Sequence, residues 1–170
     1  SVLCFAFANP FRIERYDAAT RDWLASIPLA ERPTALHCQT DSLYVAYDRK
    51  VVRLDPGTLV ETFMVNAPSS VGVLFAASDL LYVVDRGNGT VWLDRRTGVL
   101  GGQGSLGFYS VFPGVAVAPD GKTLFGVTSG ISPADILKID LAPAGGIAAS
   151  KDSPYHGAYP IGSWAAVLPG

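Results

Sequence analysis

Histidine and cysteine are the residue types here best suited to catalysis or metal binding, and the chain has few of either. It contains two histidines, His37 and His156, and two cysteines, Cys4 and Cys38. His37 and Cys38 are adjacent in a segment with strand character, so their side chains point to opposite faces of a sheet. They therefore cannot act together as nucleophile and base. We expect His37 to be a satisfied core or channel-facing imidazole.

A metal or cofactor site would need more ligands than this pattern supplies. No group of His, Cys and carboxylate residues has the spacing of a zinc site, and no phosphate-binding glycine motif precedes a helix. We therefore expect no metal, no cofactor and no catalytic residues.

The two cysteines lie in apolar strand segments and outside any Cys-x-x-Cys motif. Free cysteine is among the most buried residue types, which favours two buried, reduced thiols that react slowly with polar thiol reagents. A single disulfide between Cys4 and Cys38 is the alternative.

Aspartate recurs at the end of a repeated pattern: an apolar run, a turn, then a short strand. These closing residues are Asp17, Asp55, Asp94 and Asp140, at steps of 38, 39 and 46 residues. A period near 40 residues built from short strands is typical of β-propeller blades. Since each aspartate closes a different blade, we expect the four to lie far apart, each accepting backbone N–H groups in the next turn.

Alternating apolar residues and turn signals divide the later units into four strands each, and no helical period appears. The expected strands are 34–38, 43–47, 51–55 and 62–66; then 72–76, 80–84, 90–94 and 99–103; then 115–118, 123–127, 136–140 and 146–149. Residues 18–24 are expected to form a turn and a strand. The fold class is therefore all-β, a β-propeller of four four-stranded blade units.

The two ends of the chain have complementary strand counts. The first unit opens directly on the strand 3–7, whereas residues 163–170 repeat the first-strand pattern of 112–119. A single propeller domain, 1–170, is expected to contain units of about 1–33, 34–71, 72–114 and 115–162, with 163–170 as a closing strand. Because unpaired strand edges are costly, we expect Trp164–Leu168 to pair with Val2–Phe7, in the same chain or a partner.

Four blade units are compatible with three different assemblies. Two chains could form an eight-bladed ring, a homodimer by exchange of the C-terminal strand. The four units could instead close a four-bladed ring, or the chain could be a fragment of a longer propeller.

Two segments resemble the repeat of the YVTN-type β-propeller family: Gly114–Phe125, which contains a Pro-Asp-Gly turn, and Leu81–Gly98. The family is similar to lactonase-like and quinoprotein-like propellers, so the resemblance implies a fold and leaves the activity open. A hydrolytic, lactonase-like propeller with a site in the central channel is the alternative function. Such a site needs several carboxylates, Asn or His on inner strands, and the inner segments here offer one His.

Charged and aromatic residues gather in the loops at one end of the blades, namely those between second and third strands and those between units. The candidate ligand or partner face consists of Arg12, Arg32, Arg49, Asp85, Arg86, Tyr109, Tyr155, His156 and Tyr159. Arg and Tyr are common anchors of interfaces. The function we infer is a non-catalytic scaffold or binding module for a protein or small ligand.

The amino-acid composition further limits the classes of partner that we expect. The net charge is −2 with 16% charged residues, which gives no reason to expect nucleic acid. At 49% hydrophobic residues the chain is too apolar for disorder, and Asp, Arg or Gly interrupts every apolar run before it reaches the length of a membrane span.

Overall fold

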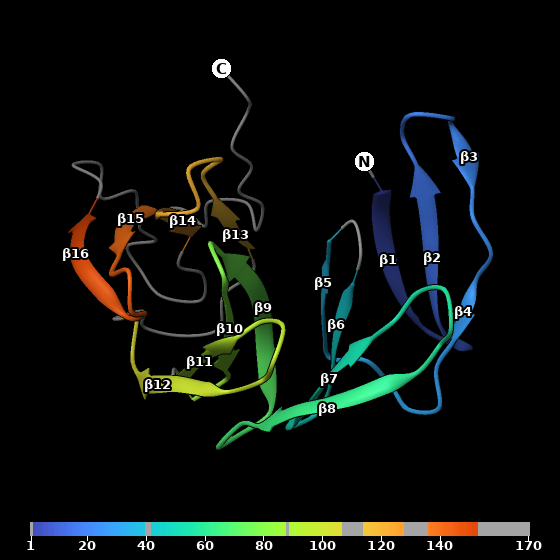
Figure 1. Cartoon of the computed structure of the whole chain (residues 1–170), viewed down its shortest axis with the longest axis horizontal. Helices are drawn as coiled ribbons and strands as arrows, with labels where there is room; N and C mark the ends of the chain where they lie inside the picture. The colour runs from blue at the N-terminus through green and yellow to red at the C-terminus, as the bar shows by residue number, and fades with distance from the viewer. Residues whose placement is uncertain (1, 40–41, 88, 107–113, 128–135, 153–170) are drawn as a thin grey trace, which may run out of the picture.

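The chain folds into four β-sheets that stand side by side as propeller blades. A computed structural model describes residues 2–39, 42–87, 89–106, 114–127 and 136–152. Within these ranges there are sixteen strands and no helix, and the strands form four four-stranded antiparallel sheets. The blades follow one another along an open arc (Figure 1). The prediction of an all-β fold with four four-stranded blades is confirmed, and the architecture is that of a partial β-propeller.

Among the described residues, blade one has no strand in the innermost position that β5, β9 and β13 occupy in the other blades. Its strands are β1 (Val2–Ala8), β2 (Phe11–Asp17), β3 (Asp22–Trp23) and β4 (Ile27–Pro28). Both β3 and β4 pair with β2, so together they form one interrupted outer strand. Among the described residues β1 therefore has a partner on one side only, as the missing first strand predicts.

Blades two to four each run from an inner to an outer strand in chain order. Their strands agree with the expected ones within a residue or so, except that β16 extends further. Blade two contains β5 (Ala35–Cys38), β6 (Leu43–Tyr47), β7 (Lys50–Leu54) and β8 (Glu61–Asn66). Blade three contains β9 (Val71–Ala77), β10 (Leu80–Asp85), β11 (Thr90–Asp94) and β12 (Leu100–Gly104). Blade four contains β13 (Gly114–Val117), β14 (Thr123–Val127), β15 (Ile136–Leu141) and β16 (Ile147–Asp152).

Apolar cores lie between successive blades, because alternate residues of each strand face opposite neighbours. Ile13 of blade one packs with Val45 and Leu54 of blade two. Further clusters join blade two to blade three and blade three to blade four. The described parts of blades one and four share no such core, which leaves the arc open.

The closing aspartates stabilise local turns. Asp17, Asp55 and Asp94 each accept the backbone N–H group two residues further on, at 2.8–3.0 Å. Asp140 differs, since its carboxylate lies 3.1 Å from the Lys138 ammonium. The prediction of a turn-stabilising role is confirmed for three of the four.

The prediction that the cysteines are buried and reduced is wrong. Cys4 and Cys38 form a disulfide with a Cα–Cα distance of 6.1 Å, and both residues are half-buried. The reason lies in the arrangement of the blades: β1 is the innermost strand of blade one, so it lies beside β5, the inner strand of blade two. Apolar neighbours in sequence indicate burial but do not show which two strands face each other.

Candidate functional site

The connections that were expected to carry a ligand face meet at one end of the blades, which we call the arginine end. It comprises the β1–β2, β6–β7 and β10–β11 turns and the β4–β5 and β8–β9 connections. Backbone bonds tie these connections together: the Ala67 N–H donates to the Arg49 carbonyl at 2.9 Å, and the Arg86 N–H donates to the Ser70 carbonyl at 2.8 Å. The arginine-bearing turns are thus fixed to the loop between blades two and three.

Three of the predicted arginines are exposed at this end. Arg32 lies in the β4–β5 connection, Arg49 in the β6–β7 turn and Arg86 in the β10–β11 turn. The Arg49 Nε also donates to the Ala67 carbonyl at 3.0 Å. Arg12 is partly buried in β2, where its guanidinium pairs with Glu14 and stacks over the Phe7 ring at 4.6 Å.

The carboxylate of Asp85 is bound by backbone N–H groups and has a structural role. It is only 5% exposed, and its carboxylate accepts the N–H groups of Gly87 at 2.8 Å, Gly89 at 2.9 Å and Ser69 at 3.3 Å. A side chain at position 89 would bring Cβ within 2.8 Å of the Asp85 carboxylate, which explains the glycine there. Asp85 therefore holds the turn that presents Arg86.

The four remaining predicted residues lie outside the described residues: Tyr109, Tyr155, His156 and Tyr159. Their membership of the arginine end stays a prediction.

A shallow depression of about 440 Å³ opens at the arginine end, lined by Glu31, Tyr47, Asp48, Arg49, Lys50 and Asn66. The Tyr47 hydroxyl donates to Glu61 at 2.8 Å, and Lys50 Nζ lies 3.6 Å from Glu31. Burial, reinforced by the Glu61 carboxylate, raises the pKa of Tyr47 above its usual range, so the phenol stays protonated. The depression is thus lined by positively and negatively charged side chains, and hydrogen bonds and ion pairs hold some of them in place.

Sequence reasoning placed Arg49 in this region but missed Tyr47, Glu61 and Asn66. Tyr47 and Asn66 are the strand residues that end beside the expected turn, because Tyr47 pairs with Lys50 and Lys50 with Asn66. Extending the candidate face one residue into each flanking strand would have found both.

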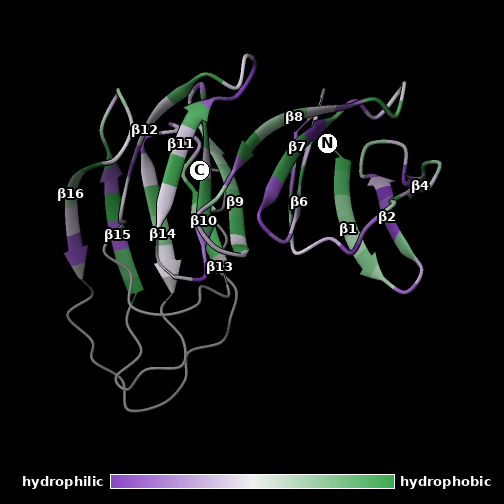
Figure 2. Ribbon diagram, turned by 90° about the horizontal axis from the view of Figure 1, so that it is seen from below, coloured by the Kyte–Doolittle hydropathy of each residue, from purple (hydrophilic) through white to green (hydrophobic). Residues whose placement is uncertain are grey.

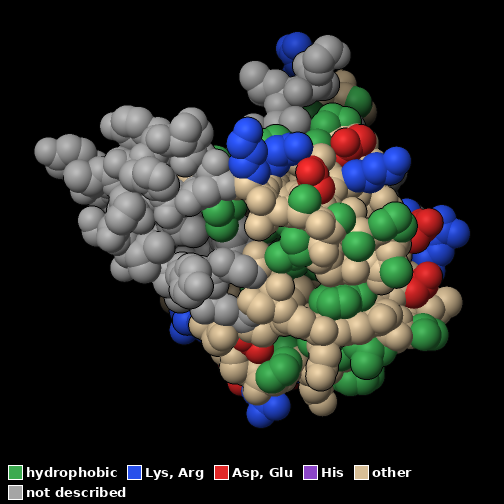
Figure 3. Space-filling view, turned by 90° about the vertical axis from the view of Figure 1, so that its left-hand side faces the viewer, with side chains coloured by type: hydrophobic (Ala, Val, Ile, Leu, Met, Phe, Trp, Pro, Cys, Tyr) green, Lys and Arg blue, Asp and Glu red, His purple; other side chains and the backbone are tan. Residues whose placement is uncertain are grey.

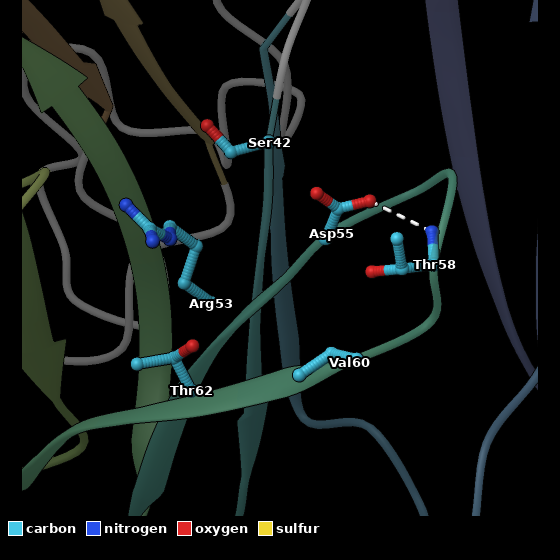
Figure 4. Close-up of a pocket in the computed structure, with 6 residues that line it drawn as sticks. All are labelled: Ser42, Arg53, Asp55, Thr58, Val60 and Thr62. Atoms are coloured by element: carbon cyan, nitrogen blue, oxygen red, sulfur yellow. Dashed lines mark hydrogen bonds between the residues drawn. The ribbon is translucent and has the colours of Figure 1, made fainter.

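A second hollow of about 420 Å³ lies at the opposite end of blade two, lined by Ser42, Arg53, Asp55, Thr58, Val60 and Thr62. Figure 4 shows the Asp55 carboxylate turned toward Thr58 and the Arg53 guanidinium pointing away from both. Backbone N–H groups, that of Thr58 first, hold the pKa of Asp55 below its usual value. Arg53 donates to the Arg96 carbonyl at 2.9 Å. Both charged groups are bound to backbone and do not form an acid–base pair.

His37 lies between blades two and three, with its ring 6.2 Å from that of Tyr44. Its Nε2 is buried and has no hydrogen-bond partner among the described residues, where we expected a satisfied imidazole. Burial, with a smaller contribution from the Arg95 cation, lowers the pKa of His37 to about 4. His37 is neutral at pH 7 and faces a neighbouring blade.

The lowered pKa of His37 predicts that the folded protein loses stability at acidic pH. The folded-state pKa of about 4 lies below the unfolded value of 6.5. Between these values the unfolded chain binds a proton that the folded chain excludes, so stability falls as pH drops from 6.5 toward 4. We expect this group to remove about 1–2 kcal/mol, since it keeps some contact with water. Urea unfolding at pH 7 and pH 4.5 measures it.

His37→Gln is the matched variant, because glutamine cannot take up the proton. Its free energy of unfolding should change less over the same interval. An equal pH dependence in both proteins would show that His37 does not contribute.

Two kinds of feature are missing from the part of the chain that the structure describes. No group of three or more His, Cys, Asp or Glu side chains could hold a metal ion. No helix there has the length and apolar character needed to cross a membrane.

Comparison with known proteins gives structural neighbours only. No family model and no curated protein matches the chain. A structure of hydrazine synthase from Kuenenia stuttgartiensis matches with a TM-score of 0.65 and 18% identity over 84% of this chain and 43% of that one. A structure of the mitotic checkpoint complex matches with a TM-score of 0.67 and 16% identity over 89% and 46%.

A third neighbour is a functionally unknown protein from Desulfotomaculum acetoxidans DSM 771, with a TM-score of 0.69 and 13% identity over 95% of this chain and 54% of that one. The chain thus spans about half the length of these neighbours. At such identities the likeness shows the propeller-like fold alone.

Proposed function

We propose that this chain is a non-catalytic propeller module that binds a protein or small ligand through carboxylate or phosphate groups at its arginine end. The observation that carries the proposal is the placement of three exposed guanidiniums, Arg32, Arg49 and Arg86, on connections at one end of the arc. Arginine binds carboxylate and phosphate in a bidentate geometry that lysine cannot match. The depression beside Arg49 supplies further donors and acceptors.

The fold of the structural neighbours does not determine their function, so the site is the better guide to what this chain does. These neighbours include a synthase and a checkpoint complex, so similar blades serve unlike functions. A hydrolytic site in the central channel is not proposed, because no observation among the described residues favours it.

YVTN-type repeats are part of the proposal. Support comes from the Pro119-Asp120-Gly121 turn, where Asp120 accepts the Lys122 N–H at 2.8 Å and Gly121 has φ of 65°. The Gly121 N–H donates to the Ala118 carbonyl at 2.9 Å, so the turn fits the longer hairpin loop in which a glycine with positive φ follows a type I turn.

The binding test uses a fluorescein-labelled peptide of glutamates as an acidic probe. Arg49→Ala and Arg86→Ala should each weaken its binding by roughly three- to tenfold, since each removes a charge-assisted contact worth about 1 kcal/mol. Fluorescence anisotropy at low ionic strength measures the dissociation constants.

Arg96→Ala is the matched control, because Arg96 is equally basic, 75% exposed and located at the opposite end. It should bind the probe like the parent protein. Equal losses for Arg96→Ala and Arg49→Ala would mean that the probe responds to net charge alone, and the site would be wrong.

We further propose that residues 163–170, which lie outside the described residues, close a two-chain ring by pairing with β1 of a second copy. The pairing of β1 with β2 alone among the described residues supports this. Deleting Ser163–Gly170 should lower the free energy of unfolding by roughly 2–5 kcal/mol through lost pairing and apolar burial. Chemical unfolding of both proteins measures this, and a truncated protein as stable as the parent would contradict strand closure.

A further inference from the structure

A hollow of about 280 Å³ lies between blades three and four, at the end of the blades opposite the arginine end. Its walls are mostly apolar: Ala77, Leu80 and Tyr82 come from blade three, and Leu141 comes from blade four. Figure 2 shows these two blades as neighbouring sheets, with hydrophobic residues along β9. The exposed residue Lys122 lies at the rim. We call this space the blade-four hollow.

Matching hydrogen bonds identify equivalent positions in blades three and four. The Arg95 N–H donates to the Asp79 carbonyl at 3.0 Å, and the Leu141 N–H donates to the Lys122 carbonyl at 2.8 Å. Each donor directly follows a closing aspartate, and each acceptor directly precedes the second strand of its blade. Leu141 of blade four therefore occupies the position of Arg95 in blade three, and Lys122 occupies that of Asp79.

The tyrosines of the two successive interfaces also correspond. Tyr44 of blade two and Tyr82 of blade three each stack on the ring of the residue that pairs with them on the inner strand. Two places after that stacked partner comes Gln39 in blade two and Ala77 in blade three. Ala77 therefore occupies the position of Gln39.

In the interface between blades two and three, side chains of the chain itself fill the equivalent space. The Arg95 guanidinium donates to Gln39 and lies 3.7 Å from the Asp79 carboxylate. The Tyr44 hydroxyl donates to the Arg95 carbonyl at 2.9 Å. One interface later, leucine stands at the position of Arg95 and alanine at that of Gln39, so both side chains are shorter and apolar. The blade-four hollow is thus the space that Arg95 and Gln39 fill one blade earlier.

Exposed apolar side chains alone would not identify a binding site, because the surface displays several. Phe63 and Leu100 are each 59% exposed on outer strands. On the side of the molecule where β12 and β16 lie, Figure 3 shows hydrophobic side chains scattered among charged ones. The blade-four hollow differs because its walls belong to the core: Tyr82 is 1% exposed and Leu141 is 8% exposed. An apolar group that enters the hollow therefore leaves water for an enclosed apolar surface.

The charge at the rim is reversed relative to the earlier interface. Where blade three carries Asp79, which pairs with Arg95, blade four carries Lys122. Lys122 makes no ion pair with any described residue. The neighbouring Asp120 carboxylate instead accepts the backbone N–H groups of Lys122 at 2.8 Å and Thr123 at 3.2 Å. An ammonium group beside an apolar hollow favours a ligand with an anionic head group.

We propose that the blade-four hollow binds a small amphiphilic carboxylate, with its carboxylate at Lys122 and its apolar body against Leu80, Tyr82 and Leu141. The size of the hollow supports a short ligand. An apolar cavity of roughly 150 Å³ admits benzene, and the blade-four hollow measures about 280 Å³. We therefore expect an apolar body of about six to eight carbon atoms. The hollow and the arginine end share no residue, so this proposal and the proposed function can fail separately.

Isothermal titration calorimetry of the full chain with sodium octanoate tests the inference. We expect saturable binding at one site, with a dissociation constant of roughly 1 mM or below, because a short alkyl chain leaves water. Octylammonium has the same chain and the opposite charge. It should bind at least about tenfold more weakly, because its head group would meet the ammonium of Lys122.

Variants at the rim and in the walls locate the site. Lys122→Ala should raise the octanoate dissociation constant by about two- to fivefold, the range expected for an ion pair that keeps contact with water. Lys151→Ala is the matched control and should bind like the parent, since Lys151 is exposed on β16 and does not line the hollow. The triple variant, Ala77→Gln with Lys122→Asp and Leu141→Arg, places the side chains of the earlier interface in the hollow. It should raise the dissociation constant by about tenfold or more.

A parent protein without saturable octanoate binding up to about 10 mM would overturn the inference. So would equal affinities for octanoate and octylammonium, because Lys122 would then not select the head group. Octanoate binding that Arg49→Ala weakens and the triple variant leaves unchanged would place the carboxylate at the arginine end and reject the hollow. Circular dichroism separates a filled hollow from a lost fold, and if the triple variant does not fold, Lys122→Ala and octylammonium decide the result.

Discussion

Replacing Cys38 by serine is expected to lower the free energy of unfolding by about 3–4 kcal/mol. The Cys4–Cys38 disulfide closes a loop with a sequence separation of 34 residues, and cross-links of that length stabilise mainly by restricting the unfolded chain. It also joins β1 to β5, so its loss should free blade one from blade two. Urea unfolding of the oxidised parent and the variant measures the difference.

The double variant, Cys4→Ser with Cys38→Ser, is the control, because it removes the bond without leaving a free thiol. It should match the single variant, and the parent in reducing agent should approach both. A loss under about 1 kcal/mol in all three would show that the disulfide does not hold the two blades together.

Replacing Asp85 by alanine is expected to cost about 2–4 kcal/mol, a large effect for a loop residue. Its carboxylate accepts three backbone N–H groups from Gly87, Gly89 and Ser69. Asp85 is only 5% exposed, so water cannot easily replace the lost acceptor. Thermal and urea unfolding give the change, and binding of the acidic probe should weaken as well, because the Arg86 turn loses its support.

Asp85→Asn keeps an acceptor oxygen in the same place and should cost less than Asp85→Ala. Asp120→Ala is a second control, since Asp120 also accepts turn N–H groups, at 2.8 Å from Lys122, but lies exposed. It should cost about 1 kcal/mol or less. If Asp85→Ala were no worse than Asp120→Ala, the buried carboxylate would not organise the arginine end.

The blade strands could be predicted from the sequence because each depends on local signals. Alternation and turn residues such as Asp120-Gly121 determine β13 and β14 whatever lies beside them. The aspartate turns were predictable for the same reason, since Asp55 and Asp94 contact backbone two or three residues away.

Features that depend on contacts between blades were not predictable in this way. The disulfide requires β1 to lie beside β5, and the ring of His37 stacks on that of Tyr44, with its Nε2 unpaired among the described residues. The glycines of β12 are a further case. A Cβ at Gly102 would come within 2.7 Å of the Trp92 ring, a constraint that the glycine-rich sequence alone does not explain.

The candidate site combines both kinds of information. The turns carrying Arg49 and Arg86 follow from the strand pattern, and backbone hydrogen bonds join both turns to the connection between β8 and β9. The depression beside Arg49 depends on cross-strand neighbours: Tyr47 reaches Glu61 on β8 only after three strands have paired. The local sequence pattern indicates which turns lie at this end of the blades. The pairing of the strands determines which side chains line the depression there.

Amide hydrogen exchange with and without the labelled glutamate peptide tests the binding proposal most directly. We expect slower exchange in the connections of the arginine end, at residues 31–32, 48–50 and 86–87, with little change in the turns 55–58 and 94–98. Protection confined to those opposite turns, or none anywhere at saturating peptide, would contradict it.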